Sequence, residues 1–231
     1  PTEAETAYLL DLARGCPQIA GVVGWCDLSD VGAAGRLARM AENPKLRGVR
    51  PMLQDLPQDD WIAAAPDPGT MAEMLRLGLR FDALVTPRHL SALQVFHDRY
   101  PDLPIVIDHA AKPHLASGTD AGWVAAMARL AKSPRVWCKL SGLLTEMTPA
   151  QRETPDSTLA VLRPIVANLL TWFGPDRLIW GSDWPVLTLA VPHGDWLALT
   201  DRLLDGLSHS ERAAIHGDNA RRFYGLERIV P

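Results

Sequence analysis

The sequence predicts an α/β fold built on a parallel sheet whose strands alternate with helices. Short apolar runs, typical of strands buried on both faces, recur at intervals of about 30 residues, the length of a strand–helix unit. Amphipathic helical patterns fill the intervals between these runs. Such alternation implies a parallel sheet covered by helices, and a barrel and a doubly wound sheet both fit it.

Six segments are predicted to be strands because each is a largely apolar run with polar residues at its ends. They are 19–26, 46–50, 81–85, 105–108, 136–140 and 178–180. Tight hairpin signals such as Asn-Gly do not occur between them, as expected for parallel strands. The sequence also has no glycine-rich phosphate loop, which weakens the case for a nucleotide-binding doubly wound domain.

Apolar residues at helical spacing mark the segments between the strands. Thr2 and Glu5 form a capping-box pattern ahead of a helix that ends near Gly15. Because no linker rich in Gly, Ser or Pro interrupts the chain, residues 1–231 are interpreted as one domain. The other helical stripes, whose ordinary role is core packing, are Leu90, Leu93 and Phe96; Trp123, Met127 and Leu130; and Leu159, Leu162, Ile165, Val166 and Leu169.

The composition excludes several classes of protein. The 231 residues are 47% hydrophobic and 22% charged, as in ordinary globular proteins, and the net charge of −4 argues against nucleic-acid binding. No apolar run reaches the roughly 18 residues that a membrane span requires. Cys16, Cys26 and Cys138 are far apart and odd in number, which favours buried thiols in a reducing compartment, here the cytoplasm.

Polar and ionisable residues gather at the C-terminal ends of the predicted strands. In barrels and other parallel α/β folds, ligands bind at this edge of the sheet. Because all six strands end this way, we expect the functional site there. The residues are Asp27, Arg50, Thr86, Arg88, His89, Asp108, His109, Lys112, His114, Lys139, Ser141 and Asp183.

Asp183 and His109 are the main candidates for chemistry. A carboxylate such as Asp183 is costly to bury unless it is paired or bound to a metal, and it can also take a proton from water. The alternative role for Asp183 is a turn residue before Pro185. His109 can ligate a metal or polarise a carbonyl, or it can be a core histidine bonded to a backbone carbonyl. Asp108 is a candidate partner of His109 unless it faces the other side of the strand.

Four further residues are candidates for contacts with a substrate. Arg50 can hold a carboxylate or hydroxyl groups through two hydrogen bonds, or it can form an ion pair at the strand end. Lys112 and His114 follow His109 closely in the sequence. Trp184 can stack on a ring or pack in the interior.

Six motifs spread along the whole chain carry a family likeness. They are Ile107-Asp108-His109, Cys138-Lys139-Leu140-Ser141-Gly142-Leu143, Arg177-Leu178-Ile179-Trp180-Gly181-Ser182-Asp183-Trp184-Pro185, Gly21-Val22-Val23-Gly24-Trp25-Cys26-Asp27-Leu28, Leu46-Arg47-Gly48-Val49-Arg50 and Asn219-Ala220-Arg221-Arg222-Phe223-Tyr224. Together they resemble the amidohydrolase-2 family, in the branch of metal-dependent hydrolases that includes sugar-acid lactonases.

The resemblance implies a TIM (β/α)₈ barrel that uses a divalent metal, often zinc or manganese, to activate water. Members of the branch hydrolyse aldonolactones derived from fucose, rhamnose or galactose, and a pyrone dicarboxylate. His109 matches the family's histidine after a central strand, and Asp183 matches its catalytic aspartate after the last strand. Both are therefore implied metal ligands. Arg50 matches a substrate-contacting arginine.

One feature of the family is missing from this sequence. The family's first strand carries a His-x-His pair that supplies two metal ligands, and no such pair occurs here. We therefore expect the chain to lack the first one or two strand–helix units and to hold about six of the eight strands. Part of the branch works without a tightly bound metal, so the resemblance implies hydrolysis more strongly than it implies metal dependence.

The expected reaction is hydrolysis of a sugar-acid lactone or a related small carboxylated lactone. Asp183 takes a proton from water, the hydroxide attacks the lactone carbonyl, and Asp183 returns the proton to the leaving alkoxide. The metal, or His109 with Arg50, stabilises the oxyanion. The alternatives are a decarboxylase of the same superfamily and a non-catalytic remnant that binds sugar acids. The expected partners are the small-molecule lactone and, in a homo-oligomer, further copies of the chain, with no nucleic acid and no membrane.

Overall fold

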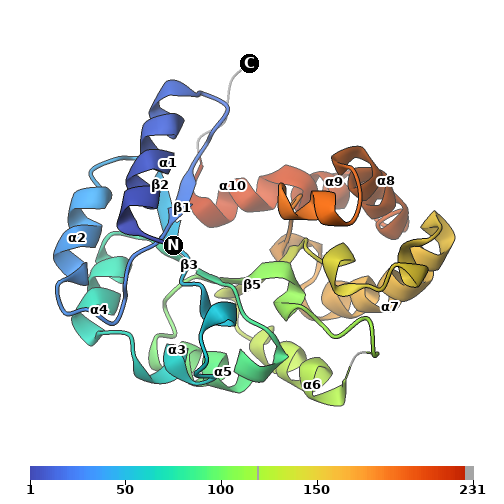
Figure 1. The fold of residues 1–231 in the computed structure, drawn as a ribbon, viewed down its shortest axis with the longest axis horizontal. Helices are drawn as coiled ribbons and strands as arrows, with labels where there is room; N and C mark the ends of the chain where they lie inside the picture. The colour runs from blue at the N-terminus through green and yellow to red at the C-terminus, as the bar shows by residue number, and fades with distance from the viewer. Residues whose placement is uncertain (119, 227–231) are drawn as a thin grey trace. The chain divides into compact units, whose positions relative to one another are not determined.

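The computed structural model describes residues 1–118 and 120–226 (Figure 1). The chain divides into two compact units, the first made of residues 1–106 with the segment that begins at Arg221, and the second of residues 107–220. Each unit contains strands and helices that alternate along the chain. The single domain over 1–231 stays a prediction, and residues 119 and 227–231 of it lie outside the described residues.

Parallel strands form the centre of the first unit. Val22 lies opposite Leu46, and Val49 lies opposite Phe81, so neighbours in the chain are neighbours in the sheet. These residues are buried and form part of the apolar core of the unit. The strands are β1 (Val22–Gly24), β2 (Leu46–Val49) and β3 (Arg80–Ala83), followed by β4 (Ile105–Ile107), which crosses into the second unit.

Helices cover the strands of the first unit, and the first of them lies very close to β1. A Cβ atom on Gly24 would lie 2.4 Å from the Thr6 side chain, so only glycine allows this approach. Tyr224, near the end of the described chain, donates a hydrogen bond of 2.6 Å to the buried carboxylate of Asp82 in β3. The helices are α1 (Glu3–Gly15), α2 (Ala33–Met40), α3 (Trp61–Ala64), α4 (Pro68–Arg76) and α5 (Leu90–Arg99). Along the chain, α10 (Asn219–Tyr224) begins in the second unit and ends in the first.

The second unit continues the alternation of strands and helices. β5 (Val136–Leu140) and β6 (Leu178–Trp180) are parallel neighbours. The long helix α7 (Pro155–Phe173) begins with the capping box of Thr154 and Ser157, and its buried face contains the predicted stripe from Leu159 to Leu169. The other helices are α6 (Ala121–Leu130), α8 (His193–Leu203) and α9 (His209–Ala213), and the short helical turns include η3 (Asp108–Ala111), η4 (Leu144–Glu146) and η7 (Val186–Leu189).

The predicted strands are confirmed in position, but the first is much shorter than the predicted 19–26, the second and fourth end one residue early, and the third spans 80–83 rather than 81–85. Before β1, the Ile19 carbonyl accepts a hydrogen bond from the Lys45 ammonium group rather than from a strand. After β1, the backbone of Trp25 bonds in both directions to the Thr6 hydroxyl. Side chains therefore take the backbone hydrogen bonds that a longer strand would need.

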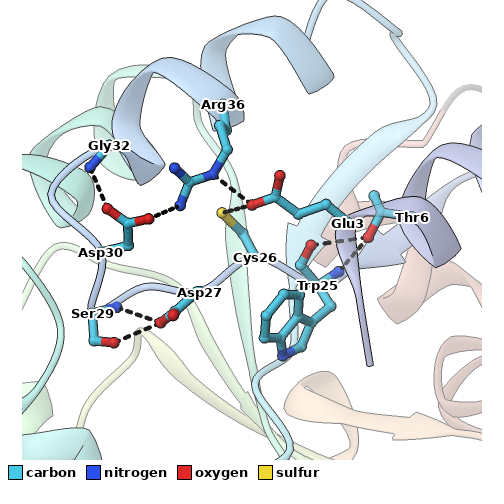
Figure 2. Close-up of polar contacts among 9 residues, drawn as sticks. All are labelled: Glu3, Thr6, Trp25, Cys26, Asp27, Ser29, Asp30, Gly32 and Arg36. Carbon is cyan, nitrogen blue, oxygen red and sulfur yellow. Dashed lines mark hydrogen bonds and ion pairs between the residues drawn. The ribbon is translucent and has the colours of Figure 1, made fainter.

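A polar network joins α1, the segment after β1 and α2 (Figure 2). The guanidinium of Arg36 donates to Glu3 at 2.6 Å and to Asp30 at 2.9 Å. The buried thiol of Cys26 lies 3.5 Å from the same Glu3 carboxylate. Asp27, one of the strand-end candidates, accepts hydrogen bonds from the backbone and hydroxyl of Ser29, which is a turn role rather than a catalytic one.

This network predicts an unreactive thiol. Burial, reinforced by Glu3, raises the pKa of Cys26 to about 12, and burial also raises the pKa of Cys138. Because the thiolate is the reactive form, we expect a disulfide reagent at pH 8 to modify both residues more than about 100-fold slower than the half-buried Cys16. All three should react in denaturant. Stopped-flow labelling of the Cys16→Ser variant checks this, and a remaining fast phase would contradict it.

Candidate active site

His109 lies directly after β4, at the start of an unusual backbone segment. His109, Ala110, Ala111 and Lys112 have φ angles of 53°, 50°, 58° and 50°, so four consecutive residues are left-handed. This conformation costs a residue other than glycine about 1–2 kcal/mol. The predicted strand 105–108 accordingly stops at β4, because the chain turns here. Such strain persists only where the surroundings hold it, and it clusters at functional sites.

Asp183 lies after β6 and faces His109. Its φ angle is 58°, again in the left-handed region. The Asp183 Oδ1 atom lies 3.5 Å from His109 Nε2, and the two side chains are 16% and 10% exposed. The Asp183 carbonyl also accepts a hydrogen bond from the Leu187 amide, so the residue opens a turn as well. The structure thus brings together the two residues predicted to carry the chemistry.

The other side of the His109 ring is fixed by the segment after β5. The Ser141 hydroxyl lies 2.8 Å from His109 Nδ1. A Cβ atom on Gly142 would lie 2.5 Å from both Cγ and Nδ1 of the ring, so the bare backbone of Gly142 packs against the imidazole. Gly142 also has a φ angle of 62°, which favours glycine. Ser141 and Gly142 therefore set the orientation of the ring toward Asp183.

Burial favours the neutral form of His109. Burial lowers the pKa of His109; Asp108 and Asp183 oppose that effect, and Lys139 and Lys112 add to it. Ser141 satisfies Nδ1 in either neutral tautomer. When its hydroxyl donates to Nδ1, an Nε2–H group faces Asp183; when it accepts, the Nε2 lone pair does. The first form is a hydrogen-bond donor, and the second can ligate a metal.

The ion pair of Asp108 and Lys139 lies beside this histidine. Lys139 Nζ is 2.7 Å from Asp108 Oδ1, and the Asp108 side chain is fully buried. Lys139, on β5, is therefore the counter-ion of the buried Asp108 carboxylate, which directly follows β4. The pair adds two charges of opposite sign that both act on His109.

Lys112 and His114 both act on the carboxylate of Glu146, a residue that was not among the candidates from the sequence. Lys112 Nζ lies 3.9 Å from Glu146 Oε1, on the short helix η4. Burial raises the pKa of Glu146; Lys112 and His114 oppose this effect, and Asp183 adds to it. These side chains consequently share one electrostatic environment with the Asp183–His109 pair.

The two remaining candidates differ in their surroundings. Trp184, next to Asp183, is 68% exposed, so it does not pack in the interior. Arg50 belongs to the first unit, where it lines a cavity with Trp25, Thr6 and Met52. Its predicted contact with the substrate stays a prediction.

Sequence reasoning missed Glu146 and the roles of Ser141 and Gly142. Glu146 lies in a turn beyond the end of β5 and belongs to no recognised motif, so nothing in its local sequence marks it. Ser141 and Gly142 stood in a strand-end motif, but their contact with His109 is between residues distant in the sequence.

The fit of a metal ion to these residues is partial. A catalytic zinc ion takes about three protein ligands, and His109 with Asp183 offers an imidazole and a carboxylate at suitable proximity. Within residues 1–118 and 120–226, no cluster of three or more His, Cys, Asp or Glu side chains is placed to hold a metal ion. The described residues therefore do not complete a metal site by themselves.

Comparison with known proteins identifies the family. A family model described as amidohydrolase matches residues 1–226. The chain belongs to the amidohydrolase family. One relative of this amidohydrolase is L-fucono-1,5-lactonase of Burkholderia ambifaria, which is 50% identical over 99% of this chain and 78% of that protein. L-fucono-1,5-lactonase of Burkholderia multivorans is 39% identical over 96% of this chain and 77% of that protein.

A solved structure supports the same assignment. The crystal structure of an amidohydrolase from Burkholderia multivorans with bound zinc is 39% identical and superposes with a TM-score of 0.88, over 98% of this chain and 80% of that one. The predicted family and the predicted barrel class, with six parallel strands in the described residues, are therefore confirmed for this amidohydrolase. None of its described helices has the length and apolar character of a membrane span.

Proposed function

We propose that this amidohydrolase opens the ring of a sugar-acid lactone by hydrolysis, with Asp183 and His109 as its catalytic pair. The proposal is carried by their convergence at 3.5 Å in a partly accessible site. The 50% identity to an L-fucono-1,5-lactonase over 99% of the chain supports lactone hydrolysis as the reaction. The finer proposal is that the substrate is L-fucono-1,5-lactone or a closely similar aldonolactone.

In the proposed mechanism, Asp183 acts first as a general base. Its carboxylate takes a proton from a water molecule, and the water oxygen bonds to the lactone carbonyl carbon. The ring carbon–oxygen bond then breaks, and Asp183 returns the proton to the leaving alkoxide. The product is an open-chain hydroxy acid. Asp183 suits both steps because it is only 16% exposed and lies beside a neutral imidazole rather than a fixed cation.

His109 supports this reaction by donating a hydrogen bond. With the Ser141 hydroxyl donating to Nδ1, the Nε2–H group is available to the oxyanion that forms on the carbonyl oxygen. Such donors act strongly when they are fixed before the reaction, and the backbone of Gly142 holds the ring in place. Arg50 is proposed as a second donor to the substrate.

The alternatives lose support. The two Burkholderia relatives that cover nearly the whole chain, at 50% and 39% identity, are L-fucono-1,5-lactonases, so neither a decarboxylase nor a non-catalytic binding protein is favoured. As the alternative to the donor role of His109, a metal, zinc or manganese, is proposed to take the Nε2 lone pair of the other His109 tautomer and the Asp183 carboxylate among its ligands, and it would polarise the lactone carbonyl when bound. A cytoplasmic location and a homo-oligomeric state are proposed as well.

A lactone panel tests the proposed function. We expect L-fucono-1,5-lactone to be hydrolysed with a kcat/KM of at least about 10⁴ M⁻¹ s⁻¹, measured by acid release with a pH indicator after subtraction of spontaneous opening. Assays with added zinc and with added manganese run in parallel. Release of carbon dioxide from aromatic or unsaturated acids, with no turnover of any lactone, would overturn the proposal in favour of the decarboxylase.

A further inference from the structure

Lys112 and Glu146 form a charged pair with unused hydrogen-bonding capacity. Their closest charged atoms are 3.9 Å apart, which is beyond hydrogen-bond length. Neither side chain makes a hydrogen bond elsewhere within residues 1–118 and 120–226. The two side chains are only 23% and 26% exposed. An ammonium group and a carboxylate are thus held close together, partly shielded from water, and without direct bonding.

Lys112 and Glu146 belong to segments that also carry, or contact, the segments of His109 and Asp183. Lys112 ends the left-handed segment that begins at His109, so its backbone is fixed by the same strained turn. Glu146 is the last residue of η4, and η4 lies against η7, the helical turn in the loop that begins with Asp183. Lys112 and Glu146 therefore approach the catalytic pair from two separate loops of the second unit.

The electrostatics show that the pairing is incomplete. Burial, with a smaller contribution from the Asp183 carboxylate, raises the pKa of Glu146 even though Lys112 and His114 oppose the effect. A carboxylate in a close, well-formed ion pair would show the reverse, because an adjacent cation favours the charged form. The Glu146 carboxylate is therefore partly desolvated without full compensation, and a further donor would stabilise it.

We propose that Lys112 and Glu146 form the subsite that binds a hydroxyl group of the lactone, which accepts a hydrogen bond from Lys112 and donates one to Glu146. The inference rests on the proposed lactonase function and adds the group that recognises the polyol part of the substrate. A hydroxyl is both donor and acceptor, so it satisfies an ammonium group and a carboxylate at once. An unsubstituted lactone lacks this group and leaves both charges unsatisfied.

The dimensions of the gap suit a hydroxyl. Charge-assisted hydrogen bonds to an oxygen are about 2.7–2.9 Å long. Two such bonds to one oxygen, with end atoms 3.9 Å apart, meet at an angle of about 90°. This angle is close to that between the hydrogen and a lone pair on a hydroxyl oxygen. A carbonyl oxygen cannot donate to Glu146, so the subsite discriminates for hydroxyl groups.

The test compares two lactones of equal ring size, L-fucono-1,5-lactone and δ-valerolactone, which has no hydroxyl groups. We expect Glu146→Gln and Lys112→Met each to lower kcat/KM for the sugar lactone by about tenfold to 100-fold, mainly through KM. The values for δ-valerolactone should change less than about twofold. The double variant should lose little more than either single variant, because both residues hold one hydroxyl. Calorimetric titration with L-fuconate gives a second readout.

Matched controls separate this role from a structural one. Glu153→Gln and Lys132→Met change exposed residues of the same unit and should leave both lactones unaffected. An equal fall for both lactones in Glu146→Gln would show that the pair only supports the site, which overturns the subsite. Unchanged KM and L-fuconate binding would overturn it as well. If the unaltered protein hydrolysed neither lactone, the proposed function itself would fail.

Discussion

Replacing Asp183 by asparagine is expected to lower kcat for the lactone by about 10³- to 10⁴-fold with little change in KM. Asparagine keeps the size of the side chain but cannot accept a proton from water at neutral pH. It also tolerates the left-handed φ angle of 58° at this position, so the loop after β6 should keep its shape. Steady-state kinetics with background subtraction measures the loss, and thermal unfolding confirms that the fold persists.

Asp205→Asn is the control for this experiment. Asp205 is an exposed aspartate in the same unit, so the variant makes the same chemical change away from the site. It should retain full kcat. If Asp183→Asn were folded and hydrolysed the lactone at more than about a tenth of the original rate, Asp183 would not be the general base.

Replacing Gly142 by alanine is expected to lower kcat/KM by about 100-fold or more. The added methyl group would lie 2.5 Å from the His109 ring, so the imidazole must move. A displacement of about 1 Å at a catalytic group can cost that much. Alanine at a φ angle of 62° also destabilises the fold by about 1–2 kcal/mol, so activity must be measured well below the midpoint of thermal unfolding.

Gly78→Ala isolates the effect of the clash from that of the backbone. Gly78 has a φ angle of 64°, close to that of Gly142, but a Cβ atom there would meet nothing nearer than 3.7 Å. We expect Gly78→Ala to lower the unfolding temperature without lowering kcat/KM. Equal kinetics in the two folded variants would show that Gly142 does not position His109.

The strands were predictable because most residues of each are apolar and buried in the core. β5 and β6 begin and end at the predicted residues and pair with each other along their whole length. The first strand was predicted too long at both ends. There the Thr6 hydroxyl and the Lys45 ammonium group take the backbone partners, and these residues come from other segments of the chain.

The site was predictable only at ionisable residues that directly follow an apolar strand. Asp183 and His109 follow apolar strands and are costly to bury without a partner, which makes them visible in the sequence. Glu146 is one acidic residue among many, and only its distance from Lys112 distinguishes it. The role of Gly142 depends on its contact with the His109 ring, which comes from another loop. The sequence alone therefore does not show why a glycine is needed at this position.

The left-handed segment from His109 to Lys112 limits how this enzyme can be engineered for heat resistance. Ala110 and Ala111 look like ideal places for glycine, since each would lose a steric penalty of about 1–2 kcal/mol in the folded state. Glycine would also widen the conformational range of the unfolded chain, which offsets part of that gain. The same backbone freedom would make the position of the His109 side chain less well fixed. Sequences selected for turnover are therefore expected to keep the strained residues, and durability is better sought at the exposed surface.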